Sequence, residues 1–233
     1  EQIHILGSKQ DIEGFKNWVD EFNRGKYLQL ASELVNPAIE ELDNFLLDFL
    51  KKFNVKSKQF EELKSRLGVD ALGATDILNK LIWYVENRNE ETLPEEAAHM
   101  LVALMGENHP EIKELLLNIT NWEEYESIKN QYLPIYKDES KVKIEAIGKL
   151  IAKSLVKNYK ANGLDNNKLK AALENIINFI KNILNSINIG DAFKYNPSIA
   201  DKIAINVLSG NKDYIYKIKN FNPNLNAKKE INN

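Results

Sequence analysis

The sequence feature that most constrains the fold is residues 93–106, LPEEAAHMLVALMG, an apolar run whose ionisable side chains are Glu95, Glu96 and His99. Pro94 in the first turn and the glycine that closes the run predict a helix between them. A helix that is apolar on nearly every side must bury most of its surface. Buried carboxylates and imidazoles need hydrogen-bonded partners or a metal ion, so the rest of the fold has to supply one or the other.

Glu95, Glu96 and His99 share one arc of about 100° when the helix is drawn at about 100° per residue. The two acids fit an ordinary helix start, because first-turn acids suit the helix dipole. Thr92 with Glu95 also forms the T-x-x-E pattern of a capping box. That explanation leaves out His99, which either a hydrogen bond in the core or a metal ion can satisfy.

A later segment carries a second unexpected acid. Residues 138–163 follow a helical period and predict a long amphipathic helix whose apolar face is rich in isoleucine. Glu145 falls on that apolar side with the small Gly148 nearby, whereas the lysines of the segment, Lys149 among them, fall outside it. The ordinary explanation of Glu145 is an acid at the edge of the core that pairs with a neighbouring Lys or Tyr. The alternative is a ligand of a shared site.

The inventory of metal ligands is narrow, because the chain has no cysteine and 3 histidines. A metal site must therefore use His, Asp, Glu or backbone oxygen. Glu96 and His99 also fit the E-x-x-H of di-iron bundles, which need a second such motif on another helix. His4 falls in a predicted strand and His109 directly precedes a proline, which disfavours that alternative. Serine and cysteine catalysis lack their motifs.

Periodicity and turn residues predict an α+β fold that is predominantly α-helical. Strands are predicted over 2–7 and, after a short helix at 76–80, over 81–86. The other predicted helices are 8–25, 36–54, 57–68, 93–106, 109–120, 121–133 (capped by Asn121), 138–163, 166–190 and 196–211, followed by a loosely ordered polar tail at 220–233. A boundary near Ala161–Gly163 divides the prediction into a domain over 1–160 and a C-terminal helical extension over 161–233.

The charge balance limits the partners that we expect. The formal net charge is −3, and lysines and glutamates are interspersed, so neither nucleic acid nor an anionic membrane is expected as a main partner. No window of about 18 consecutive apolar residues predicts a membrane span. The first ten residues lack the pattern of a signal peptide.

Several of these features together resemble the zincin metallopeptidases. A strand, a short polar loop, a helix with E-E-x-x-H and a Glu on a later helix are similar to the gluzincin branch, whose helix carries H-E-x-x-H. The resemblance implies that His99 is a metal ligand, Glu96 the general base for peptide-bond hydrolysis and Glu145 a further ligand. It also implies that residues 81–86 form the edge strand that lies along the substrate. Tyr132 and Tyr136 are candidate hydrogen-bond donors to the reacting group or members of an ordinary amphipathic segment.

The chain departs from the family pattern at Glu95, where zincins have His. A carboxylate is an accepted zinc ligand, so Glu95 can complete a site for Zn²⁺ or another divalent ion. A second acid weakens the Lewis acidity of the metal and favours harder ions. The alternative is that the ligand has been lost and the site is inactive.

Residues 75–160 also resemble zincin-like segments within the large polyvalent proteins of phages and mobile elements. That resemblance implies other protein chains, including virion components, as partners. It implies a location in a phage virion or in the cytoplasm of the bacterial host. It also implies an alternative function, as a catalytically inactive structural or cargo protein of the virion.

Overall fold

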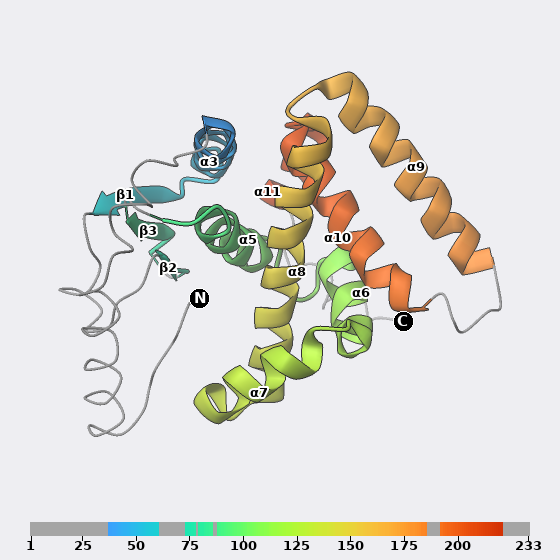
Figure 1. Ribbon diagram of the computed structural model, residues 1–233, viewed down its shortest axis with the longest axis horizontal. Coiled ribbons are helices and arrows are strands. Elements are labelled where there is room, and N and C mark those ends of the chain that lie inside the picture. Colours follow the sequence, from blue (N-terminus) through green and yellow to red (C-terminus); the bar gives the residue numbers. More distant parts are fainter. Residues whose placement is uncertain (1–36, 61–72, 78, 86–87, 186–191, 221–233) are drawn as a thin grey trace, which may run out of the picture.

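The computed structural model describes residues 37–60, 73–77, 79–85, 88–185 and 192–220 (Figure 1). Its described parts form eight α-helices, one short 3₁₀ helix and a three-stranded sheet, which confirms the predominantly helical α+β class. The elements are α3 (Pro37–Lys51), β1 (Lys56–Phe60), β2 (Gly73–Asp76), β3 (Leu81–Val85), α5 (Thr92–Met105), α6 (Pro110–Asn118), η1 (Ile119–Asn121), α7 (Tyr125–Tyr136), α8 (Glu139–Asn162), α9 (Asn166–Asn185), α10 (Ala192–Leu208) and α11 (Lys212–Asn220).

The small sheet has the order β1–β3–β2, with β3 parallel to β1 and antiparallel to β2. The strand expected over 81–86 is present as β3, but the expectation that it is an edge strand is wrong because it has a neighbour on each side. β2 lies beside α5 instead. The predicted helices over 57–68 and 76–80 are wrong where β1 and β2 occupy their first residues. Pairing with β3 decides the conformation of both segments against their local pattern.

α5 begins at Thr92, and the side chain of Asn89 in the preceding loop binds its first residue. The side-chain oxygen of Asn89 accepts hydrogen bonds from the backbone N–H groups of Glu91 at 3.1 Å and of Thr92 at 2.9 Å. It also accepts one from the Thr92 hydroxyl at 2.7 Å. The predicted capping box is therefore wrong, because Thr92 is a donor to the preceding loop. The burial expected for this helix is confirmed for most of its residues, among them Leu93 and Met105, both 0 % exposed.

α8 is the central helix of the molecule. The Asp138 side chain caps its start by accepting a hydrogen bond from the backbone N–H of Ser140 at 2.9 Å. Gly163, with a φ of 59° in the left-handed region that favours glycine, ends it as predicted. α5 and the sheet lie on one side of α8, and α10 lies on the other (Figure 1). α7 packs across its first half.

α6 and α7 correspond to the helices predicted over 109–120 and 121–133. Asn121 does not cap α7 as predicted, since it is the last residue of η1 and α7 begins at Tyr125. Both helices pack on α8, and α7 ends next to the start of α8, so it reaches the region where α5 and α8 cross.

The C-terminal helices share one hydrophobic cluster with the helices that precede them. The predicted boundary at Ala161–Gly163 coincides with the turn between α8 and α9, and one hydrophobic cluster joins Ile151 of α8 to Ile203 of α10. α10 begins at Ala192, four residues before the helix predicted over 196–211, and contains Pro197. α11 was not predicted, and it turns Tyr214 and Ile218 toward the core.

Some predictions lie outside the described residues. These are the strand over 2–7, the helix over 8–25 and the tail beyond Asn220. Among the helices in the described ranges, none is both long and apolar enough to cross a membrane.

Candidate metal centre

The predicted ligands meet where α5 crosses α8. Nε2 of His99 lies 3.8 Å from Oε1 of Glu95, four residues earlier on α5, and 3.5 Å from Oε1 of Glu145 on α8. One ligand-type atom from each of the three side chains lies within 4.8 Å of the other two. Glu145 is buried on the apolar side of α8, as its position in the helical pattern predicts. Tertiary packing of two helices thus assembles the trio.

The spacing suits one divalent cation. In a tetrahedral arrangement with bonds of about 2.1 Å, ligand atoms lie about 3.4 Å apart. The distances from His99 to Glu145 and to Glu95, 3.5 and 3.8 Å, are close to that value. The wider limit of 4.8 Å for the trio requires a carboxylate to move by about 1 Å to close the third side. Two carboxylates and one imidazole are accepted zinc ligands, so the residues present fit such an ion.

Gly148 makes the position of the His99 ring possible. A β-carbon at residue 148 would lie 2.4 Å from Nδ1 and 2.5 Å from Cε1 of His99. Side chains do not tolerate contacts this short, so the imidazole sits in space that only glycine leaves open. Gly148, three residues after Glu145 on α8, therefore leaves room for the histidine of α5.

Glu96 faces the same region from α5. It is 3 % exposed, and its Oε2 accepts a hydrogen bond from the Thr75 hydroxyl of β2 at 2.5 Å. Glu96 lines a cavity of about 490 Å³ together with His99, Glu145 and Tyr136. The candidate base and two of the three candidate ligands therefore share one cavity. Sequence reasoning missed Thr75, because its strand pairing was not predicted.

Two tyrosines of α7, Tyr132 and Tyr136, lie near Glu145. The Tyr136 hydroxyl donates a hydrogen bond to Oε2 of Glu145 at 3.1 Å. The Tyr132 ring stacks on that of Tyr136, with centroids 5.7 Å apart. Burial, with the Glu145 charge, raises the pKa of Tyr132 to about 12 and raises that of Tyr136 as well. Both phenols therefore stay protonated at neutral pH, and Tyr136 is a stable donor to the candidate ligand.

Lys149 is the principal site residue that sequence reasoning missed. Its ammonium donates a hydrogen bond to Oε1 of Glu95 and lies 3.7 Å from Oε1 of Glu145. Its side chain is 19 % exposed, so Lys149 is largely covered although it falls outside the apolar face of α8. A signal was present, because Lys149 follows Glu145 by four residues and opposite charges at that helical spacing are neighbours.

The cluster is strongly ionised. Burial by itself would lower the pKa of His99, but hydrogen bonds with Glu145 and Glu95 outweigh burial and raise the pKa to about 10. Burial would raise the pKa of Glu95, yet the hydrogen bonds with His99 and Lys149 hold it below its usual value. Burial opposes the charge of Lys149 too, and Glu95 keeps the pKa of that ammonium above its ordinary range. A histidine that binds a metal must be neutral. Metal binding would therefore release the proton of His99, and the ion would replace the positive charge of the imidazolium.

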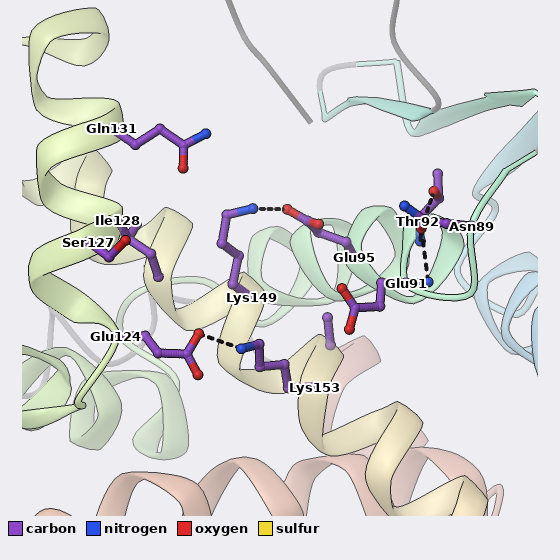
Figure 2. Close-up of a pocket in the computed structure, with 11 residues that line it drawn as sticks. Asn89, Glu91, Thr92, Glu95, Glu124, Ser127, Ile128, Gln131, Lys149 and Lys153 are labelled. Carbon is purple, nitrogen blue, oxygen red and sulfur yellow. Dashed lines mark hydrogen bonds and ion pairs between the residues drawn. The ribbon is translucent and has the colours of Figure 1, made fainter. Parts of the chain in front are cut away.

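A second cavity, of about 780 Å³, lies on the Glu95 side of the cluster, between α5, α7 and α8 (Figure 2). Lys149 crosses it to reach Glu95, and Lys153 pairs with Glu124 on another wall. Gln131 of α7 lines the same cavity. The ligand trio therefore lies between two cavities, one on the Glu96 side and one on the Lys149 side.

Comparisons of the chain with protein-family models, with curated proteins and with solved structures found no match. The function of the protein is therefore inferred from the geometry of this site and from the residues that compose it.

Proposed function

We propose that the protein is a zincin-like domain that holds one divalent metal ion through Glu95, His99 and Glu145. The observation that carries this proposal is the meeting of three ligand-type side chains from two helices within 4.8 Å. Gly148 supports it, because the fold keeps a glycine where the His99 ring needs space. Two acids in the ligand set make the site more negative than a zincin site with two histidines, which favours harder ions than the usual zinc site does.

The reaction that this arrangement supports best is hydrolysis of a peptide bond. A bound divalent ion supplies Lewis acidity and lowers the pKa of water. Glu96 takes the proton from the attacking water and passes it to the leaving amine. Thr75 holds the Glu96 carboxylate toward the cavity, and Tyr136 orients Glu145 through its hydroxyl. Each of these roles is assigned to a side chain that lines or borders the same cavity.

Metal content is the first test. Elemental analysis of protein purified without a chelator or a polyhistidine tag should find about one Zn, Mn or Fe per chain. His99→Ala should lose that metal. His109→Ala is the matched control, because His109 is a largely covered histidine that lies at the start of α6, outside the trio. A wild-type protein that holds no metal and takes none up in a titration would overturn the proposal.

Catalysis needs a separate test with Glu96→Gln. The amide keeps the size of the side chain and an acceptor for the Thr75 hydroxyl, but it cannot take a proton. Metal content should stay the same, while peptidase activity on an unstructured protein substrate should fall at least about 100-fold. Activity that is unchanged in this variant would remove Glu96 from the mechanism.

A second candidate function is that of a catalytically inactive structural or cargo protein of a phage virion. The ion pair between Lys149 and Glu95 favours it, because the ammonium supplies positive charge to the trio without a metal. Under this function the wild type has no peptidase activity, and Glu96→Gln leaves folding and assembly with partner chains unchanged. A wild-type peptidase activity that Glu96→Gln abolishes would refute it.

A further inference from the structure

The two oxygen atoms that Lys149 contacts are the atoms that a metal ion would need. Its ammonium donates to Oε1 of Glu95 and lies 3.7 Å from Oε1 of Glu145. Those same two oxygens lie 3.8 and 3.5 Å from Nε2 of His99 and complete the ligand trio. An ammonium and a divalent ion at this position would therefore compete for the same negative charge.

We propose that Lys149 is a built-in competitor for the metal site, which sets its affinity for divalent ions. In this proposal the ammonium neutralises Glu95 and Glu145 when no metal is bound, and an entering divalent ion displaces it. The inference rests on the proposed metal site, and it adds the residue that controls occupancy of that site.

The cavity of Figure 2 provides the space for this exchange. Lys149 lines it, and so do Glu124, Ser127 and Gln131 of the α7 side, whose side chains offer oxygen acceptors for a displaced ammonium. The Lys149 side chain is 19 % exposed, so its head group can leave Glu95 without opening the core. A lysine has a flexible four-carbon stem, which makes such a movement possible at the level of one side chain.

Lys149 also contacts α7 in the position in which it is paired with Glu95. The Lys149 ammonium lies 5.3 Å from the centre of the Tyr132 ring, which attracts cations through its face. We expect metal binding to change the distribution of charge along the part of the cavity wall between α5 and α7, while the helices stay in place. Occupancy of the site and the electrostatics of the second cavity are thereby coupled.

The test compares Lys149→Met with Lys153→Met in the full chain. Lys153 is the matched control, because it lies one turn further along α8, lines the same cavity and pairs with Glu124 rather than with the trio. Isothermal titration with Zn²⁺ should give a Kd roughly tenfold or more lower in Lys149→Met than in the wild type, since a like charge has been removed from the site. Lys153→Met should stay within about twofold of the wild type.

Thermal unfolding supplies a second readout. Without metal, Lys149→Met should melt below the wild type, because Glu95 and Glu145 lose their compensating cation, and saturating Zn²⁺ should restore the loss. Lys149→Arg keeps the charge and should bind Zn²⁺ no more tightly than the wild type does. If Lys149→Met does not fold, Lys149→Gln makes the same comparison, because it retains a donor for Glu95 without the charge.

The outcomes separate this inference from the metal site on which it rests. Zn²⁺ binding to neither the wild type nor Lys149→Met would overturn both the metal site and the competition. Wild-type binding that Lys149→Met does not tighten would overturn the competition alone. Zn²⁺ binding to Lys149→Met but not to the wild type would overturn the proposed function of the wild type, and it would support the competition in its strongest form, in which the ammonium excludes the metal.

Discussion

The two halves of α8 make polar contacts of different kinds with the helices around them. In the second half, Lys157 pairs with Oδ2 of Asp201 on α10 at 2.6 Å, and the Asn158 amide donates to Oδ1 of the same carboxylate at 2.8 Å. In the first half, Lys149 and one histidine face the carboxylates of Glu95 and Glu145.

The difference lies in the balance between acids and donors. One carboxylate with a donor on each oxygen is a complete structural contact, and it needs nothing further. The buried Glu145 and the half-buried Glu95 lie around an imidazole, and the buried Glu96 lines one cavity with Glu145. These acids concentrate negative charge in a place where burial makes that charge costly. The excess of acid therefore separates a candidate cation site from an interhelical ion pair on the same helix.

Added metal should distinguish the two clusters most strongly. Zn²⁺ at 100 times its Kd should raise the free energy of unfolding by about 2.7 kcal/mol. Glu145→Gln should abolish this stabilisation, since it removes a ligand. Asp201→Asn should lower the stability of the metal-free protein yet leave the increment from Zn²⁺ intact. Chemical denaturation with and without Zn²⁺ measures both, and an increment lost in Asp201→Asn would contradict the distinction.

Gly148→Ala tests the space that the site cluster requires. The added β-carbon would lie 2.4 Å from Nδ1 of His99, so we expect a loss of about 2 kcal/mol in the free energy of unfolding and no detectable Zn²⁺ binding. In a His99→Ala background the clash is gone, and the same substitution should stabilise the helix by about 1 kcal/mol. Denaturation of the four proteins of this cycle gives both values. Equal effects in the two backgrounds would mean that the clash does not govern the site.

Asp43 provides a third case, an acid that is balanced by one base yet deeply buried. Arg88 contacts its Oδ2 at 2.7 Å through Nη2 and at 2.8 Å through Nε, while Glu40 adds like charge. Burial outweighs Arg88 and raises the pKa of Asp43 from 3.8 to about 6. The folded protein then holds a proton that the unfolded chain releases between these values, so this stabilising contribution is present below pH 3.8 and is lost as the pH rises to about 6.

We therefore expect the stability of the wild type relative to Asp43→Asn to fall as the pH rises from about 4 to about 6, with a slope of about 1 kcal/mol per pH unit. Urea denaturation at several pH values, carried out on both proteins, isolates this one group. A difference that stays constant over the range would show that Arg88 keeps Asp43 ionised throughout.

Tyr136→Phe should have the smallest effect. The loss of one hydrogen bond to Glu145 should cost about 1 kcal/mol of stability and weaken Zn²⁺ binding by about tenfold, because the ligand is less well oriented. Tyr125→Phe is the control, since Tyr125 lies on the same helix and donates at 3.3 Å to Glu139, outside the trio. Equal Zn²⁺ affinity in the two variants would mean that Tyr136 does not position the ligand.

Local patterns in the sequence predicted the two helices that carry the candidate ligands. The periodicity of residues 138–163 predicted α8 and its end at Gly163, and the buried position of Glu145 followed from that helical face. The apolar run at 93–106 predicted a buried helix in the same way. Helical hydrogen bonds and capping join residues within a few positions of one another, so the information that determines them is present in a short window.

Tertiary structure alone decided what surrounds those helices. β1 forms because it can pair with β3, and β3 lies in the middle of the sheet because β2 closes its other side. Lys149 is largely covered because α5 places Glu95 beside its ammonium. Gly148 is required because the ring of His99 occupies the space that a β-carbon would fill. Each of these outcomes depends on atoms supplied by a distant segment, and the energy of such contacts exists only after the chain has folded. The sequence by itself therefore determined the candidate ligands, whereas tertiary packing decided that the Lys149 ammonium lies beside two of them.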